Sequence, residues 1–128
     1  MGGFRARDEV AIVGYAQSQV QRHAPQTLGA LAVDTAQRAI ADAGLTVEQV
    51  DGFTTGALFP TAGAHAIQEG VSIVGSNWLA EHLGVNPRYV AGFQGYGQIP
   101  GAVALAVNAV ASGAADYVLM HRDRKSVV

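Results

Sequence analysis

The sequence predicts an α/β fold built on a mostly parallel sheet. Short apolar runs bounded by turn-forming residues alternate along the chain with longer segments whose apolar residues recur on a helical period. This alternation of strand and helix is typical of parallel sheets with right-handed crossover connections. The composition agrees, because 49% of the 128 residues are hydrophobic and only 14% are charged, which suits one folded domain.

The apolar runs predict four strands, with a helix between each pair. The strands are expected at residues 9–14, 50–56, Tyr89–Phe93 and 116–120. Each run is short and largely apolar, as the buried strands of parallel sheets are. The stretch 58–75 is rich in Gly and Ala without a clean period, so it is predicted to be a loop.

The clearest helix is expected between Thr27 and Gly44. Thr27 is a suitable N-cap, and Gly44 suits the left-handed position after the last turn. Asp34 and Arg38 form an i,i+4 pair on the polar side. The opposite side carries a stripe of apolar and small residues at helical spacing, namely Leu28, Leu31, Ala32, Ala36, Ala39, Ile40 and Ala43.

Two shorter signals mark helix starts further along. Thr46 and Gln49 have capping-box spacing, which predicts a short helical turn. Ser76 is predicted to cap a helix over residues 77–83, which Gly84 ends.

The last helix is predicted at residues 99–112, with Pro100 in its first turn. Its middle and end are apolar apart from Asn108, and a helix that is apolar all round is typically buried. The predicted architecture is therefore βαβαβαβ with a buried central helix.

Charge and composition exclude several classes of function. The formal net charge is −2, so no basic field favours nucleic acid. No run approaches the roughly 18 apolar residues of a membrane span, and the N-terminus lacks the apolar region of a secretory signal. The chain has no cysteine, which fits a cytoplasmic protein and excludes a thiol nucleophile. Its four histidines lack paired spacing, so no metal site is expected.

Several segments, taken in order, resemble the thiolase superfamily. They are the opening Val-Ala-Ile-Val-Gly, the helix that ends Ala-Ile-Ala-Asp-Ala-Gly, the Val-Asp-Gly that follows, Asn-Trp-Leu-Ala-Glu-His-Leu-Gly, and the apolar helix with its Asp-Tyr-Val-Leu strand. The nearest branch is the sterol-carrier or lipid-transfer type, which is acetyl-CoA acetyltransferase-like. The resemblance covers residues 9–121. Residues 123–128 add charge abruptly, and we expect them to be a non-native tail from read-through of foreign DNA.

The resemblance implies a layered fold of two similar halves, of which this chain holds most of the first. It implies an enzyme of lipid metabolism that acts on acyl-CoA esters, with coenzyme A as part of the substrate and no covalently bound cofactor. Some members of this branch cleave carbon–carbon bonds of steroid side-chain CoA esters by retro-aldol chemistry. The full-length parent is expected to be an acyltransferase-like enzyme or aldolase, or to have a lipid-transfer-type function, and this 128-residue piece is expected to be inactive alone.

In thiolases a cysteine stands at the N-terminus of the buried helix, where unpaired N–H groups stabilise its thiolate. The resemblance places Tyr96 at that position. A phenol, with a pKa of about 10, is a poor acyl carrier, so thiolysis through an acyl-enzyme is not expected. Tyr96 could act as a general acid/base or hold an oxyanion, which suits retro-aldol cleavage. The alternative is that Tyr96 only fills space.

The remaining candidates carry weaker signals. His65 lies in the Gly- and Ala-rich loop, where it could contact substrate or simply face solvent. His23 and His82 are expected at the surface. His121 ends a predicted strand next to Arg122, where the resemblance implies loop residues near the site, but the sequence gives it only a weak functional signal.

A nucleotide-binding turn is the rival interpretation of the glycines at 95, 97 and 101. Against it, Asp116 stands at the start of its strand, where a ribose-binding acid would stand at the end.

The resemblance also bears on partners. The third strand of family enzymes pairs across a two-fold interface, so a homodimer through Tyr89–Phe93 is expected, with a small accessory protein as a further possible partner. A second hypothesis, from another class, is a non-catalytic thiolase-like subunit that stabilises or binds another protein. The two hypotheses differ in whether Tyr96 takes part in chemistry.

Overall fold

The computed structural model describes residues 3, 5–21, 24–56, 68–71, 73–93 and 97–123. The elements, in chain order, are α1 (Leu28–Asp42), a 3₁₀ turn (Val47–Gln49), β1 (Gly52–Gly56), α2 (Ser76–Leu83), β2 (Tyr89–Phe93), α3 (Gln98–Ser112) and β3 (Val118–His121). The helices predicted from periodicity therefore form, with boundaries within one residue or so of those expected.

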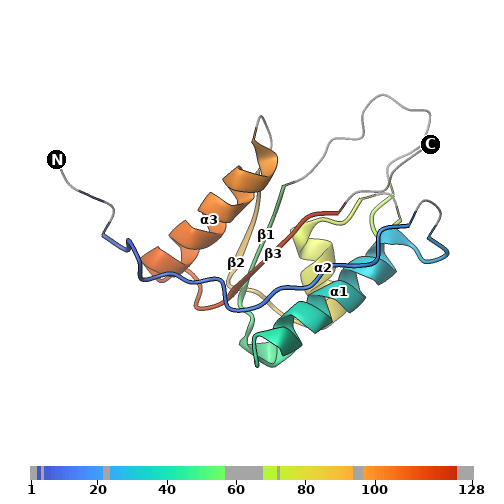
Figure 1. Cartoon of the computed structure of the whole chain (residues 1–128), viewed down its shortest axis with the longest axis horizontal. Helices are drawn as coiled ribbons and strands as arrows, with labels where there is room; N and C mark the ends of the chain where they lie inside the picture. Colours follow the sequence, from blue (N-terminus) through green and yellow to red (C-terminus); the bar gives the residue numbers. More distant parts are fainter. Residues whose placement is uncertain are drawn as a thin grey trace.

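The strands form one parallel sheet in the order β2-β1-β3. Gly52 at the start of β1 stands opposite both Tyr89 of β2 and Val118 of β3. Helix α3 covers one face of this sheet, and α1 and α2 cover the other (Figure 1). The predicted α/β class with a parallel sheet is confirmed, since α2 and α3 each connect parallel strands.

The predicted first strand is wrong for the part of the chain that is described. Residues 10–14 form no strand and pair with none of the described strands, and Ile12 is 90% exposed. The backbone lies along α1 instead, where Tyr15 N donates to Asp42 Oδ2 at 2.9 Å and Arg38 Nη2 donates to Gln17 O at 3.2 Å. An apolar run becomes a strand only when a neighbouring strand offers it hydrogen bonds, and none lies beside it here.

Local signals explain α1. Thr27 is its N-cap and accepts a hydrogen bond from Ala30 N at 3.1 Å, while Gly44 takes a left-handed φ of +72°. Asp34 and Arg38 form the expected ion pair at 3.1 Å. The apolar stripe of α1 packs into the core between the sheet, α1 and α2, whose buried members are Leu28, Ala36, Ile40, Val50, Phe53, Val74, Leu79 and Ala80.

Ser76 does not cap α2 as predicted. It is the first helical residue, Gly75 is the N-cap, and the Ser76 hydroxyl donates to Ala91 O of β2 at 3.1 Å. Glu69 Oε1 accepts from Gly75 N at 2.7 Å and so satisfies a backbone donor near the start of the helix. The serine therefore docks α2 on the sheet, because its position inside the first turn directs the hydroxyl to β2.

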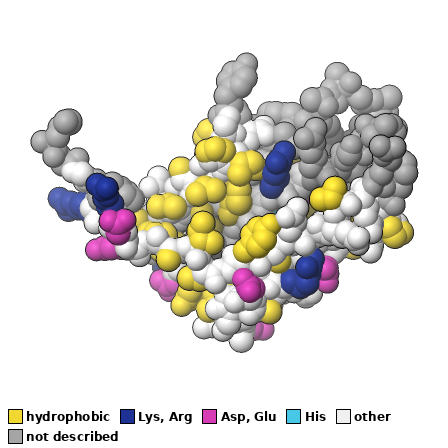
Figure 2. All heavy atoms as spheres, viewed as in Figure 1, with side chains coloured by type: hydrophobic (Ala, Val, Ile, Leu, Met, Phe, Trp, Pro, Cys, Tyr) yellow, Lys and Arg dark blue, Asp and Glu magenta, His cyan; other side chains and the backbone are white. Residues whose placement is uncertain are grey.

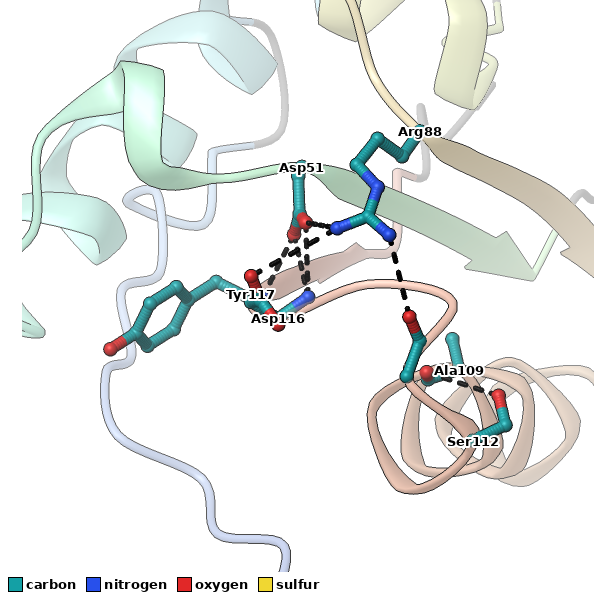
Figure 3. A network of polar contacts seen from close by, with 7 residues as sticks. Asp51, Arg88, Ala109, Ser112, Asp116 and Tyr117 are labelled. Atoms are coloured by element: carbon teal, nitrogen blue, oxygen red, sulfur yellow. Dashed lines mark hydrogen bonds and ion pairs between the residues drawn. The ribbon is translucent and has the colours of Figure 1, made fainter.

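A carboxylate joins the amino ends of all three strands (Figure 3). Asp51 precedes β1, and its Oδ1 accepts from Asp116 N and Tyr117 N, both at 2.9 Å, just before β3. Its Oδ2 lies 3.5 Å from Nη1 of Arg88, which precedes β2. Arg88 also reaches Gly113 O at the end of α3, at 3.5 Å. This network fixes where the strands enter the sheet.

Candidate active site

The carboxyl ends of the strands bring together Gly56 of β1, Phe93 of β2 and His121 of β3. Ligands of open parallel sheets bind at this edge, because the loops that leave the strands meet there. Helix α3 begins at the same edge, since Gly56 lies against the carbonyl of Gln98, the first residue of the helix. The expected site region is therefore assembled by the fold.

Two glycines allow the start of α3 to lie close to the sheet. A methyl group on Gly56 would lie 2.9 Å from Gln98 O, which is closer than a side chain can approach. A methyl group on Gly101 would lie 2.3 Å from the ring of Phe93. Thr54, fully buried, adds a hydrogen bond from its hydroxyl to Ala102 O at 3.1 Å. Gly101 thus allows α3 to pack closely on Phe93, a role that a dinucleotide-binding turn also gives to its last glycine, so this contact does not separate the two interpretations.

The first turn of α3 is electrostatically suited to an anion. Its N-cap is Gly97, with a left-handed φ of +73°, and no side chain caps this end. The first turn contains no acidic residue. A helix N-terminus of this kind presents unpaired N–H groups and partial positive charge, which stabilise a developing oxyanion. Tyr96, predicted at the family's cysteine position, is the residue before Gly97 and lies outside the described residues.

The histidine predictions have different outcomes. His65 and His23 both lie outside the described residues. His82 is exposed on α2, as predicted, where its ring stacks on Trp78 with centroids 3.7 Å apart and its Nδ1 lies 2.8 Å from Trp78 O. This stack is a surface packing contact.

His121 faces away from α3. Leu119 packs against the core between the sheet and α1 and α2, and side chains two residues apart on a strand share a face. The Nε2 atom of His121 accordingly lies 2.9 Å from Val74 O in the loop before α2. The strand pattern could have assigned this face, but the contact with Val74 could not be predicted because it joins distant segments.

The surroundings of His121 shift two pKa values. Burial lowers the pKa of His121 below its ordinary 6.5, against the opposing effects of the Val74 carbonyl and of the charges on Asp123 and Glu69. Burial also raises the pKa of Asp123, whose Oδ2 accepts from Val74 N at 2.8 Å. Asp123 therefore contacts the fold, while residues 124–128 lie outside the described part and the expectation of a foreign tail stays a prediction.

The outer face of α3 forms an open apolar groove of about 520 Å³. Hydrophobic side chains gather over this helix in the space-filling view (Figure 2). Only Ala102 and Ala109 of α3 are buried, and Val103 is 39% exposed, so the helix predicted to be buried is covered on one side alone. The groove is lined by Ile99, Pro100, Val103, Ala104, Val107 and Asn108.

The described residues offer neither a membrane-spanning helix nor a cluster of metal ligands. None of their helices is long and apolar enough to cross a membrane. Within the same ranges, no three His, Asp or Glu side chains are grouped as metal ligands would be.

Comparison with known proteins gives an informative structural likeness. No family profile matches the sequence, and no curated protein matches it. Among solved structures, the chain is similar to a chain of the "Ltp2-ChsH2(DUF35) aldolase", with a TM-score of 0.71 and 28% sequence identity. The match covers 92% of this chain and 28% of that one, so this chain spans little more than a quarter of the aldolase chain's length.

Proposed function

We propose that this chain is the N-terminal part of a thiolase-like aldolase that cleaves a carbon–carbon bond in an acyl-CoA ester. The likeness to an aldolase chain over 92% of this chain carries the proposal. The sequence supports it, because the absence of cysteine leaves no thiol on this chain to form an acyl-enzyme. A cytoplasmic location and a steroid-type acyl group belong to the same proposal.

The proposed reaction is a retro-aldol cleavage of a 3-hydroxyacyl-CoA. A base removes the proton of the β-hydroxyl, the electron pair left on oxygen forms a carbonyl, and the bond between Cα and Cβ breaks. Its electrons pass to Cα and the thioester carbonyl as an enolate, which then takes a proton at Cα. The products are a shorter acyl-CoA and a separate carbonyl compound.

Residues of this chain would serve the enolate step. The uncapped N-terminus of α3 offers N–H groups and partial positive charge to the enolate oxygen. Tyr96, directly before Gly97, would donate a hydrogen bond to that oxygen or exchange the proton of the substrate hydroxyl. His65 would contact substrate from the loop that follows β1. Gly56, Gly101 and Thr54 support this arrangement by seating α3 against the strand ends.

Partners form part of the proposal. Strand β2 is an edge of the described sheet, so its outer hydrogen-bonding groups are open to a second copy, which supports a homodimer through Tyr89–Phe93. The aldolase to which this chain is similar is named for two components, one of them a DUF35 protein. A small accessory protein of that kind is the proposed second partner.

The test requires the full-length protein encoded by the same gene. Tyr96→Phe should lower kcat for a 3-hydroxyacyl-CoA by about 10²–10³-fold while KM changes little, because the hydroxyl acts chiefly in the transition state. Tyr117→Phe is the matched control, since this tyrosine is 40% exposed at the opposite end of the sheet.

Each outcome has a distinct meaning. Turnover by the parent with a selective loss in Tyr96→Phe supports both the reaction and the role of Tyr96. Turnover that survives Tyr96→Phe removes Tyr96 from the mechanism. A parent protein that lacks turnover, alone and with its accessory protein, would favour the second hypothesis of a non-catalytic thiolase-like subunit.

A further inference from the structure

The ring of His121 contacts the backbone of the loop that leads into α2. We name residues 68–71 and 73–75 the Val74 loop. Nε2 of His121 lies 2.9 Å from the carbonyl oxygen of Val74, and a carbonyl can only accept, so Nε2 carries the hydrogen. In the neutral ring, Nδ1 is then a bare acceptor. Thr55 of β1 fixes the backbone here, because its hydroxyl donates to His121 O at 2.8 Å.

Nδ1 is the unusual atom of this contact. It is closed off from solvent and has no hydrogen-bond partner among the described residues. A second proton on the ring would have to sit on this atom, where a buried N–H without an acceptor is unfavourable. The described charged groups that act on the ring are Glu69 of the Val74 loop and Asp123 beyond β3, and their charges oppose the effect of burial.

The Val74 loop connects several elements. Val74 is 1% exposed in the core, its carbonyl accepts from His121 and its N–H donates to Asp123. Gly29 of α1 donates to Gly70 O of the loop at 2.8 Å. Trp78 of α2 packs on both glycines, since a methyl group on either would lie within 2.6 Å of its ring. Displacement of this loop would therefore change the surroundings of Trp78.

We propose that His121 is a pH-dependent latch, whose neutral ring holds the Val74 loop against the carboxyl ends of β1 and β3 and whose protonation releases it. The inference goes beyond the proposed reaction and does not depend on it. The loop lies at the edge of the sheet where ligands of such folds bind, so its release would alter access to that edge.

The lowered pKa of His121 determines whether acid or base releases the Val74 loop. Below 6.5, an exposed histidine binds a proton more readily than this buried one, so acid favours the state in which the ring is released. Above pH 6.5 the neutral ring holds the Val74 loop fully, and this hold weakens as the pH falls below 6.5.

Trp78 is the only tryptophan, so its emission reports on the Val74 loop. His82 stacks on it, so the measurement is made on the chain carrying His82→Phe, which keeps an aromatic ring there without an imidazole. Emission should stay constant above about pH 6.5 and change as the pH falls below that value, because the pKa of His121 is lowered from 6.5. Adding His121→Gln, which can still donate to Val74 O, should abolish the change.

A second measurement keeps the test valid if the glutamine variant misfolds. Exchange of the Gly29 amide, corrected for the intrinsic effect of pH, should accelerate about tenfold for each unit by which folding lowers the pKa of His121. Asp123→Asn should move the transition to lower pH, because it removes a charge that favours the protonated ring. An unchanged transition in His121→Gln, or a His121 ring that titrates at or above 6.5, would overturn the proposal.

Discussion

Phe53 and Thr54 are neighbours on β1, yet their side chains enter opposite faces of the sheet. Phe53 is fully buried in the core that α1 and α2 close. Thr54 is equally buried, but its hydroxyl donates a hydrogen bond to Ala102 O of α3 at 3.1 Å. One side of the sheet is thus held by large apolar contacts, and the other by a hydrogen bond and by contacts of small residues.

The helices show the same difference. On the α1 side, apolar side chains of several elements meet in one cluster. On the α3 side, the helix buries only two alanines and leaves an open apolar groove outward. The comparison indicates that the α1 face supplies most of the stability of this chain, whereas the α3 face is arranged around the start of a helix whose outer side the described residues leave uncovered.

The largest expected effect is the removal of Phe53. Phe53→Ala should lower the free energy of unfolding by about 3–5 kcal/mol, since the ring is fully buried and its loss leaves a cavity. That is comparable with the whole stability of a small domain, so the variant should be largely unfolded. Urea unfolding followed by circular dichroism measures it. A loss below about 1 kcal/mol would show that the α1 face is not the dominant core.

Asp51 lies in a network that links the two faces, and its substitution should have an intermediate effect on stability. Its carboxylate accepts from Asp116 N and Tyr117 N and pairs with Arg88, which reaches the end of α3. Asp51→Asn should cost about 1–3 kcal/mol, because the backbone donors lose a charged acceptor and the amide NH2 cannot pair with Arg88. Asp116→Asn is the control, since that side chain is 76% exposed and lies 4.0 Å from Arg88. Equal losses in the two variants would contradict a special role for Asp51.

Prediction from sequence succeeded where structure is decided locally. Thr27, Gly44 and the Asp34–Arg38 pair act within one helix, so their spacing was enough to place α1. It failed at residues 9–14, because a strand requires a partner that the sequence pattern does not reveal. It also failed at Ser76, which is the first helical residue and not the N-cap, and whose hydroxyl bonds the sheet.

At the candidate site, too, features decided within one helix could be predicted, and contacts between distant segments could not. The start of α3 was predicted from Pro100 and the apolar run, and the helix begins within one residue of that position. The contact between Gly56 and Gln98 O could not be predicted, because it joins segments far apart in the chain. The same holds for the contact of His121 with Val74 O. The roles of Tyr96 and His65 stay predictions, since both lie outside the described residues.

Substitutions on the outer face of α3 should have the smallest effect on stability. They should change the self-association of the chain instead. Val103 is 39% exposed and lines the groove with Val107. Because exposed apolar surface of this kind promotes self-association, the 128-residue chain should form oligomers in sedimentation velocity experiments. The double substitution Val103→Ser and Val107→Ser should shift it toward monomer.

The same variant should change the free energy of unfolding by no more than about 1 kcal/mol, because the groove is open and neither valine belongs to the core on the α1 face. Ala36→Ser in α1 is the matched control, since it adds a hydroxyl to the closed core and should lower stability without reducing association. A wild-type chain that sediments as one monomeric species and melts cooperatively would show that the α3 face is stable without a cover. The two faces would then differ only in the kinds of contact that hold them.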